Sequence, residues 1–450
     1  WLVWNLDFRA RMYPVSSFNY HRADHVKAMF QLGRGKLITA KDADWLKVHI
    51  ANCGDFDKIS KQSFDARLEW VSENHDQIIA VAEDYKKTYD YWSTADKPFQ
   101  FLAACIAYRD WLDEGAAYVC HLPPSLDGTN SGAQHYSAAM RDKETGYLTN
   151  LVPSNKCQDV YAVVAKAVTE RLKVEAAEGV DLAKIWLDFG VTRTVVKRNT
   201  MTYTYSGTQH GFGDQLKEDL MVPLINDVLY GRLKSHPFGS QREQNLAARY
   251  LAGINYDCIG DVLVAASRGM EYFRKVTGVV ALENKALRWT NPVGFPVCQR
   301  YNKSKMLKVR MFLYDREAQV HKRSQVTIKV DEEHTVDRKK AMNGCAPNVI
   351  HSLDSAHMMS SVSMMLDNGV EDFFLIHDSF GTQCADTDVM YQCVRAAFVD
   401  LYQDGTCIFE DFDDQIRDQL RDPSNAKLPD IPAKGDLDIN LVKESEYCFS

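Results

Sequence analysis

Long apolar segments are missing from this chain of 450 residues. No run approaches the roughly 18 apolar residues needed to cross a bilayer, and no secretory signal is visible, so we expect no membrane partner. An excess of basic residues is missing as well: the formal net charge is −8, which taken alone argues against a nucleic-acid partner. Internal repeats and low-complexity segments are also absent. The composition, 45% hydrophobic and 25% charged, is typical of a globular protein of two or three domains.

Closely spaced cysteine pairs are lacking too. The eleven cysteines are scattered, and no C-x-x-C pair occurs. This usage predicts free thiols in a reducing compartment, most of them small core residues, and it argues against a zinc site. The chain begins with Trp-Leu-Val-Trp-Asn-Leu, which reads as the middle of a strand, so we expect the protein itself to begin upstream.

Charge is distributed unevenly, and the distribution is more informative than the sum. Residues 371–450 carry 18 acidic and 6 basic residues, a net of −12, whereas residues 299–330 carry 9 basic and 2 acidic residues, a net of +7. We interpret the acidic block as a solvated face. The basic block favours contact with nucleic acid, with an ordinary solvated face as the alternative.

The hydrophobic patterns predict an α+β protein. Strands are expected within residues 1–20, and a β-ribbon near 296–330. Helices are expected over about 40–120, 157–175, 180–230, 352–368 and 386–403, with an irregular segment from 429 to 450. Strands therefore flank a large, mainly helical middle, as in one sheet domain that carries a helical insertion.

Two acidic residues, 251 positions apart (378 − 127), each follow an apolar, strand-like run and precede turn residues. Asp127 stands in Ser-Leu-Asp-Gly-Thr-Asn-Ser-Gly, and Asp378 stands in Phe-Phe-Leu-Ile-His-Asp-Ser-Phe-Gly. A carboxylate in such a place lies at a sheet edge and points into a cleft. Two of them brought together can hold the pair of divalent metals that in-line phosphoryl transfer requires.

A third feature is a basic helix predicted over residues 193–205. Arg193, Lys197, Met201 and Tyr205 step by four and form one stripe. Two cations one turn apart, with an aromatic ring further along, suit a polyphosphate lying on the helix and a base stacked at its end. The alternative is a surface helix with ordinary basic residues.

These motifs resemble those of single-subunit DNA-dependent RNA polymerases of the T-odd bacteriophage type, with mitochondrial and chloroplast polymerases as more distant relatives. The similarity runs from residue 1 to residue 450 and covers the C-terminal palm and fingers portion of the family. It rests on polymerase motif A at Asp127–His135, motif B from Arg193 through Lys197 and Arg198 to Tyr205, and motif C at Ile376–Gly381. Further matches are Gly294–Val297, Ala346–Ser352 and Pro432–Gly435.

The resemblance implies a two-metal nucleotidyl transfer with two Mg²⁺ ions. Asp127 and Asp378 would be the metal-binding carboxylates, with the Gly128 carbonyl as a further ligand. Arg193 and Lys197 would hold the incoming triphosphate, with Arg198 nearby. Tyr205 would lie at the base of the helix, against the nascent pair.

The resemblance also bears on the choice between RNA and DNA. Related DNA polymerases carry a bulky Glu five residues beyond the motif A aspartate, where this chain has Gly132, which leaves room for a ribose 2′-hydroxyl. His351, expected just ahead of a helix, resembles the family histidine that recognises this hydroxyl together with Tyr205. A site that hydrogen-bonds a hydroxyl rejects analogues that lack it.

Nucleic-acid contacts are implied at two further places. The segment Asp7–Arg11 resembles a family Asp-x-x-Gly-Arg element that contacts the template, so Arg9 and Arg11 are candidates for nucleic-acid binding. His377, beside Asp378, is a further candidate. Ala10 replaces the family glycine, which the loop tolerates if its φ is negative. Ser206 and His210 are two other departures from the family pattern. Within the basic ribbon, which matches the family's promoter-reading specificity hairpin, Arg310 and Arg316 are candidates for base readout.

Together these features predict a right-hand polymerase. We expect residues 1–150 and 352–450 to form the palm, residues 151–351 to form the fingers, and the N-terminal promoter-binding domain to be absent. The expected partners are promoter and template DNA, nascent RNA and ribonucleoside triphosphates. We expect a monomer that acts in the cytoplasm of an infected bacterium, with an organelle matrix as the alternative that fits the motifs less well. A DNA polymerase of the same fold and a catalytically inactive nucleic-acid-binding module remain the alternatives.

Overall fold

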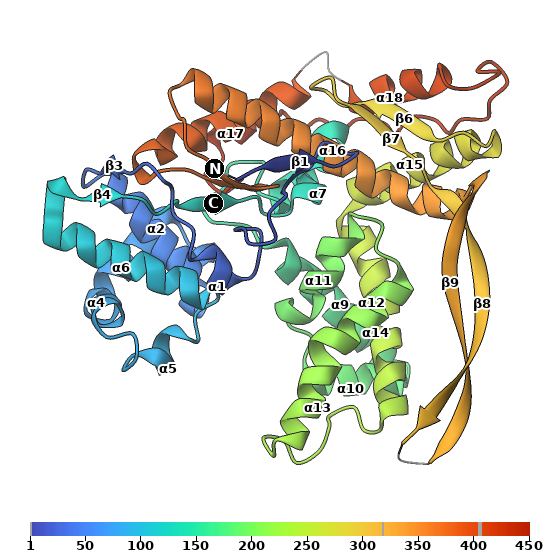
Figure 1. Ribbon diagram of the computed structural model, residues 1–450, viewed down its shortest axis with the longest axis horizontal. Helices are drawn as coiled ribbons and strands as arrows, with labels where there is room; N and C mark the ends of the chain where they lie inside the picture. Colours follow the sequence, from blue (N-terminus) through green and yellow to red (C-terminus); the bar gives the residue numbers. More distant parts are fainter. Residues whose placement is uncertain (1, 317–318, 404–406) are drawn as a thin grey trace.

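The computed structural model describes residues 2–316, 319–403 and 407–450. It is a mixed α+β structure, mostly helical, with small antiparallel sheets, as the hydrophobic patterns predict (Figure 1). Among the described residues, no helix combines the length and apolarity needed to span a bilayer. The eleven cysteines are free thiols, and all except Cys298 are buried, in agreement with the expectation of core thiols.

A three-stranded antiparallel sheet occupies the centre. It consists of β5 (Ser125–Asp127), β10 (Phe374–Ile376) and β11 (Ser379–Gly381), in the order β10-β11-β5. His377 and Asp378 form the two-residue turn between β10 and β11. Leu126 pairs with Phe380 across the sheet, and both side chains are buried, so the middle of each strand anchors the sheet in the core. The polar ends of the strands are thereby left at its edge.

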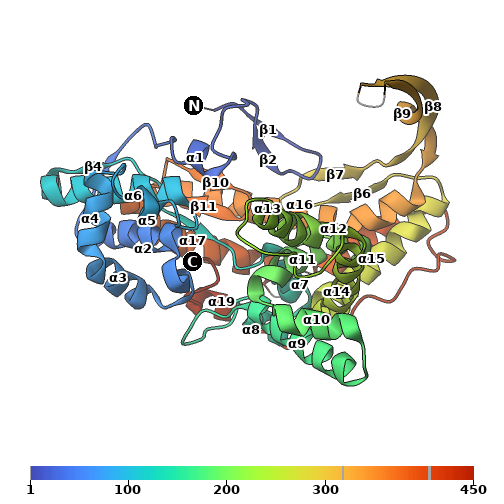
Figure 2. The ribbon, with the colours of Figure 1, turned by 90° about the horizontal axis from the view of Figure 1, so that it is seen from below.

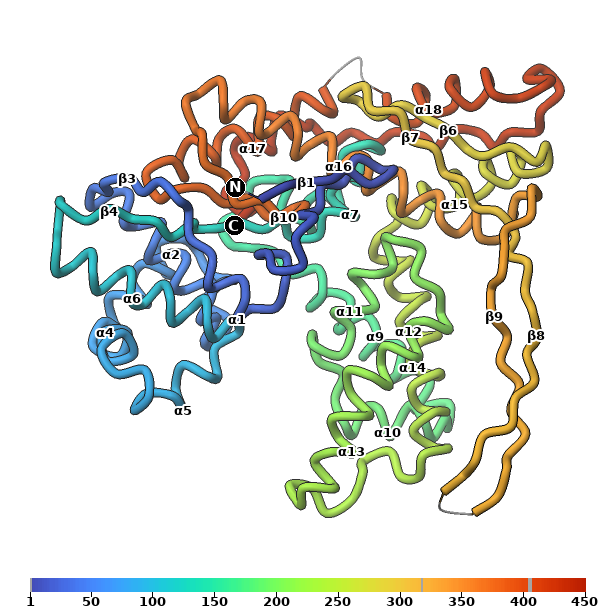
Figure 3. The backbone as a smooth tube through the Cα atoms, viewed as in Figure 1, coloured from blue at the N-terminus to red at the C-terminus, as the bar shows by residue number. Residues whose placement is uncertain are grey.

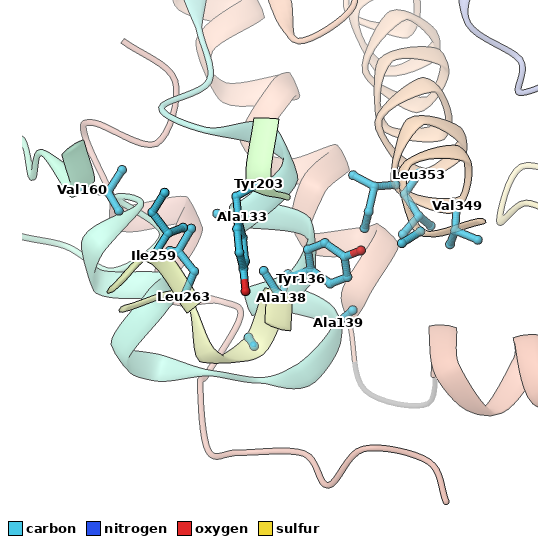
Figure 4. Packing of buried hydrophobic residues seen from close by; sticks show 14 of the residues in the cluster. Ala133, Tyr136, Ala138, Ala139, Val160, Tyr203, Ile259, Leu263, Val349 and Leu353 are labelled. Atoms are coloured by element: carbon cyan, nitrogen blue, oxygen red, sulfur yellow. The ribbon is translucent and has the colours of Figure 1, made fainter. Parts of the chain in front are cut away.

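Helices pack behind this sheet and extend its core. Helix α17 (Thr387–Tyr402) contacts β11, follows the 3₁₀ turn η4 (Cys384–Asp386), and packs on α16 (Arg338–Asp367) and α19 (Leu441–Glu444). Helix α16 packs in turn on α7 (Ser131–Met140), which contacts α8 (Lys143–Leu148), whereas α18 (Ile408–Arg417) packs on the strand β6 (Leu287–Thr290). Figure 4 shows Tyr136, Ala138 and Ala139 of α7 packed among side chains that include Val349 and Leu353 of α16. The main hydrophobic core therefore lies directly behind the motif A segment.

The expected helix over 352–368 is longer than predicted. Helix α16 begins at Arg338 and contains Pro347 in its interior. A proline removes one backbone hydrogen bond and disfavours a helix around it, which is why the sequence pattern placed the start after it. His351 consequently lies within the helix rather than ahead of it, and the expected domain boundary at 351 falls inside α16.

The first helical lobe follows the N-terminal strands, which are β1 (Trp4–Leu6) and β2 (Met12–Pro14). The lobe comprises α2 (Asp42–Gly54), η1 (Phe56–Lys61), α3 (Phe64–Glu73), α4 (His75–Glu83), α5 (Tyr89–Trp92), α6 (Pro98–Glu114) and η2 (Gly115–Ala117). The short α1 (Asp24–Lys27) and the strand pair β3 (Lys36–Leu37) and β4 (Val119–Cys120) connect it to the centre. The lobe has its own hydrophobic core.

The second helical lobe comprises α9 (Val160–Ala177), α10 (Asp181–Phe189), α11 (Arg193–Tyr203), α12 (Gln209–Leu216), the π-helical η3 (Lys217–Met221), α13 (Val222–Leu229), α14 (Gln241–Val262) and α15 (Val264–Leu282). Helix α11 packs on α9, α12 and α14. In Figures 1 and 2 the two lobes lie on opposite sides of the central sheet.

The expected β-ribbon is present, with shifted ends. A small pair, β6 (Leu287–Thr290) and β7 (Pro296–Gln299), precedes the long hairpin of β8 (Asn302–Asp315) and β9 (Val320–Val336). The hairpin projects from the body of the molecule (Figure 3). Nearly all of its side chains are exposed. Its strands extend to residue 336 because β8 and β9 pair with each other along almost their whole length. Their length is set by this pairing and not by packing on the core.

Candidate active site

The two acidic residues singled out in the sequence meet at the edge of the central sheet. Ser379 lies directly opposite Asp127 in the register of β11 and β5, and Asp378 immediately precedes Ser379. The Gly128 N–H donates to the Asp378 carbonyl at 3.2 Å, which fixes the two turns against each other. Residues opposite each other in an antiparallel pair have Cα atoms about 4.5–5.5 Å apart. The fold therefore brings both carboxylates to one place.

The backbone of Asp127 and Gly128 is held from its other side as well. Ser450 N–H donates to the Asp127 carbonyl at 3.2 Å, and Gly128 forms an isolated antiparallel bridge with Phe449. A Cβ on Gly128 would lie 3.0 Å from Gln134 Oε1 and 3.3 Å from the Phe449 ring. A larger residue at Gly128 would therefore require Gln134 and Phe449 to move by a few tenths of an ångström.

The two carboxylates differ in electrostatic environment. Burial and the negative charges of Asp354 and Asp127 raise the pKa of Asp378 to about 7. The protein atoms around Asp127 also disfavour its charge, but the positive charges of Lys97 and Lys27 outweigh this effect and hold the pKa of Asp127 below its ordinary value, while its side chain keeps one side open to water. Crowded carboxylates of this kind attract a cation. Among the described residues, no group of three or more His, Cys, Asp or Glu side chains is arranged to hold a metal, so the protein offers a pair of carboxylates.

Two lysines beside Asp127 were not foreseen from the sequence. Lys97 Nζ lies 3.6 Å from Asp127 Oδ2, and the negative charge of Asp127 raises the pKa of Lys97. Lys27, on α1, is close enough that its charge acts on both residues. No local pattern marks Lys97, which precedes a helix-starting proline and is brought to β5 only by the packing of α6.

Helix α11 begins at Arg193, as predicted, and ends at Tyr203. Arg193 forms an ion pair with Asp159 at 2.5 Å and lies over the Tyr161 ring. Lys197 lies one turn further along the helix and is an exposed residue. The protein atoms near its amine and the positive charge of Arg193 lower the pKa of that amine. Among the described residues, no carboxylate lies within ion-pair distance of Lys197. Its amine is available to a ligand.

Arg198 points elsewhere. Its guanidinium binds Asp219 at 2.6 Å and Glu218 at 3.2 Å, both on η3. The structure thus brings Arg193 and Lys197 onto one face of α11 and turns Arg198 away from them.

Tyr205 lies two residues beyond the end of α11, not on the helix as predicted. The chain leaves the helix through Thr204 and turns at Ser206, whose φ is +59°. The Tyr205 ring lies 4.7 Å, centroid to centroid, from the imidazole of His351. Burial, together with the charges of Asp378 and Asp354, raises its pKa, so the phenol stays protonated.

Gly132 has a different physical role from the one expected. A Cβ there would lie 2.3 Å from Thr204 Oγ1 and 3.2 Å from Tyr205 Cζ. The space beside Gly132 is therefore filled by the segment that follows α11. The missing side chain lets α7 and Tyr205 approach each other.

His351 is held in one tautomer by Arg9. Arg9 Nη1 lies 2.8 Å from His351 Nδ1. A guanidinium can only donate, so Nδ1 accepts and the proton of the neutral ring is on Nε2. Burial and the charges of Arg11 and Arg9 lower the pKa of His351 to about 2, so the ring is neutral. His351 therefore offers an N–H donor on its Nε2 side.

The segment Asp7–Arg11 supports the site from within. Arg9 forms an ion pair with Asp7 at 2.6 Å, and Arg11 forms one with the buried Asp354. Ala10 has a φ of +70° and is fully buried, which contradicts the condition of a negative φ set above. An L-residue in this region costs about 1–2 kcal/mol, which explains why glycine is the easier residue there.

The other candidates lie apart from the pair of carboxylates or are packed. His377, with a φ of +54°, contacts the rings of Tyr13 and His21, and burial lowers its pKa to about 3. Arg310 is exposed on β8, opposite Gln325, and Arg316 follows the end of β8. Figure 1 shows that this hairpin is remote from the central sheet.

Comparison with known proteins agrees with this arrangement of motifs. The family model described as DNA-dependent RNA polymerase matches residues 36–427, and the chain belongs to this family. It is 35% identical to T7 RNA polymerase of Escherichia phage T7 over 488 residues, which cover 100% of this chain and 53% of that protein. It is 34% identical to the DNA-directed RNA polymerase of Enterobacteria phage T3, again over 53% of that protein.

Organellar proteins are similar as well. The mitochondrial DNA-directed RNA polymerase 1 of Arabidopsis thaliana is 32% identical over 462 residues, which cover 99% of this chain and 43% of that protein. The chain thus spans about half the length, or less, of these relatives.

Proposed function

We propose that this chain catalyses DNA-templated RNA synthesis, the transfer of a nucleotidyl group from a ribonucleoside triphosphate to an RNA 3′-hydroxyl with release of pyrophosphate. The observation that carries the proposal is the meeting of Asp127 and Asp378 at one sheet edge. Family membership and the free amine of Lys197 support it.

The donor set fits magnesium. Mg²⁺ prefers a few carboxylates and completes its shell with water and substrate phosphates. Asp127 and Asp378 supply such oxygens, with the Gly128 carbonyl beside them, and their mutual repulsion favours a cation between them. Two bound Mg²⁺ ions would lower the pKa of the attacking hydroxyl and neutralise charge on the departing pyrophosphate.

The remaining groups bind and orient the nucleotide. Lys197 and Arg193 attract the triphosphate along α11. The positive charge of Lys197 stabilises the negative charge that develops on the leaving pyrophosphate. Tyr205 and the Nε2–H of His351 lie together and face the ribose, where an N–H donor suits a 2′-hydroxyl oxygen. A deoxyribose leaves this donor unpaired, and on this ground we favour RNA synthesis over DNA synthesis.

The domain assignment follows the same proposal. We infer a palm built around the central sheet and a fingers region that carries α11, with the β8–β9 hairpin contacting promoter DNA through Arg310, Arg316 and neighbouring cations. Arg9 and Arg11 act on nucleic acid indirectly, through His351 and Asp354. Promoter and template DNA and nascent RNA are the macromolecular partners of a monomeric enzyme, acting in the cytoplasm of an infected bacterium.

A primed RNA–DNA scaffold tests the chemistry without requiring a promoter. Asp127→Asn and Asp378→Asn are each expected to reduce the rate of RNA extension by about 10³-fold or more, since each removes a metal-binding charge. Asp188→Asn, an exposed position on α10, serves as the matched control and should extend normally. Unchanged extension by Asp378→Asn would refute the catalytic assignment, and a preference for deoxynucleotides would favour a DNA polymerase.

A further inference from the structure

Lys97 forms an ion pair with one of the proposed metal ligands. Its Nζ lies 3.6 Å from Asp127 Oδ2, and the side chains of Lys97 and Asp127 are 36% and 54% exposed. The pair therefore lies at the water-facing edge of the sheet. The Lys97 amine therefore engages the same carboxylate that a divalent cation would bind.

The backbone at Lys97 is fixed, whereas its side chain is long and flexible. Lys97 is the N-cap of α6, and its N–H donates to the Cys53 carbonyl at 2.9 Å. Asp24 accepts from Phe99 N–H at 2.7 Å and so ties α6 to α1. An amine on a four-carbon stem can reach the carboxylate and leave it without any change in the backbone.

Lys27 adds a second positive charge on the same side. It lies on α1, three residues after Asp24, with its Nζ 5.6 Å from the centre of the Phe374 ring at the start of β10. The junction of α1 and α6 thus directs two lysines toward the end of β5. The Asp378 carboxylate, by contrast with that of Asp127, is not paired with a lysine in the described part of the chain.

We propose that Lys97 is a tethered counter-ion that competes with the divalent cation for Asp127, so that the nucleotide-free protein binds metal weakly. This inference rests on the proposed function. An exposed ion pair contributes little stability, so a divalent cation that arrives with a triphosphate displaces the amine readily. Without the triphosphate, the cation meets an already neutralised carboxylate and a nearby positive charge. Lys97 is a positioning residue for metal loading and takes no part in bond making.

Direct metal binding tests the proposal. Mn²⁺ is titrated into the nucleotide-free 450-residue chain, and free Mn²⁺ is followed by its electron paramagnetic resonance signal. Lys97→Met is expected to bind Mn²⁺ about fivefold to tenfold more tightly than the parent chain, because a unit charge near 4 Å acts with about 1 kcal/mol even in water. Lys97→Arg, which keeps the charge, should bind as weakly as the parent.

Controls separate the possible outcomes. Lys41→Met removes an exposed lysine that pairs with Asp388 at 2.6 Å and should leave Mn²⁺ affinity unchanged. Lys97→Gln serves as a second neutral variant if the methionine disturbs the start of α6. Equal or weaker Mn²⁺ binding by folded Lys97→Met and Lys97→Gln overturns the proposal. So does a raised KM for nucleoside triphosphate at unchanged Mn²⁺ affinity, which would make Lys97 a phosphate ligand.

Failure of the underlying function gives a different result. If Asp127→Asn and Asp378→Asn bind Mn²⁺ as well as the parent chain does, the proposed metal site itself is wrong. If they lose binding while Lys97→Met matches the parent, only the role of Lys97 is wrong.

Discussion

Arg9 donates a hydrogen bond to His351, with 2.8 Å between Nη1 and Nδ1, although the two residues are 342 positions apart. This contact sets the tautomer of a ring that lies against Tyr205. Removing it with Arg9→Leu frees Nδ1 to carry the proton and the ring to rotate. We expect the ratio of kcat/KM for ribonucleotides to that for deoxynucleotides to fall by up to about tenfold, the upper end for one hydrogen bond between neutral groups.

Single-nucleotide extension with matched ribo- and deoxynucleoside triphosphates measures this ratio. Arg171→Leu, an exposed arginine paired with Glu175 on α9, is the control and should keep the ratio. An unchanged ratio in a folded Arg9→Leu variant would show that His351 does not depend on Arg9.

The raised pKa of Asp378 predicts a pH dependence of stability. Its value of about 7 exceeds the roughly 3.9 of a free aspartate, so between these pH values the folded chain binds more protons than the unfolded chain. The free energy of unfolding therefore falls as pH rises from about 4 to 7, and the loss is complete above that. Asp378→Asn lacks this titration and should become more stable than the parent across this window, by more than about 1 kcal/mol at pH 8.

Denaturant unfolding of metal-free protein at pH 5 and pH 8 measures the difference. Mg²⁺ added in large excess, enough to overcome weak binding, should stabilise the parent chain at pH 8 and leave Asp378→Asn unaffected, because the cation relieves the repulsion that the variant lacks. A constant difference between the two proteins from pH 5 to pH 8 would contradict the raised pKa.

Lys197 and Arg198 are adjacent in sequence but differ in their partners. Lys197→Met should lower the rate of nucleotide addition about 10²-fold, the scale of one preorganised charge. Arg198→Met removes a cation that Asp219 and Glu218 already engage, and the rate should change less than about threefold, since exposed ion pairs contribute little. Rapid-quench kinetics on the primed scaffold compare the two, and equal losses would place Arg198 in the nucleotide site.

Gly132 is predicted to be intolerant of a methyl group. Gly132→Ala places a Cβ against Thr204 and Tyr205, and overpacking of this kind costs about 1–3 kcal/mol. Thermal unfolding should show the loss. Gly33→Ala, where nothing lies within 4 Å of the added Cβ, is the matched control and should be close to neutral. A neutral Gly132→Ala would mean that the segment after α11 yields easily.

Local sequence patterns located the proposed catalytic pair but not its surroundings. Asp127 and Asp378 each follow an apolar run at a turn, which is a signal within one segment, and the sheet register then brings them together. Lys97 carries no such signal. Its position beside Asp127 comes from the way α6 packs on α2 and α1 in the folded protein, which no periodicity of the sequence expresses.

The same limit applies to contacts between distant segments. The ion pair of Arg11 with Asp354 joins residues 343 positions apart, and no pattern in either segment predicts it. Pro347 misled the prediction for α16, because tertiary packing holds a helix that local preference would end. The spacing of four residues already singled out Tyr205, whereas family resemblance, rather than residue pattern, singled out His351.

Phe449 and Ser450 form part of the wall around motif A. Phe449 bridges Gly128, and Ser450 bonds to the carbonyl of Asp127, so two residues with no reactive side chain buttress the strand that presents a proposed ligand. Crowding of Phe449 or Ser450 would shift that carboxylate as surely as a replacement nearby in the sequence. A flexible insertion for handling the protein is therefore safer in an exposed loop than beside these two residues.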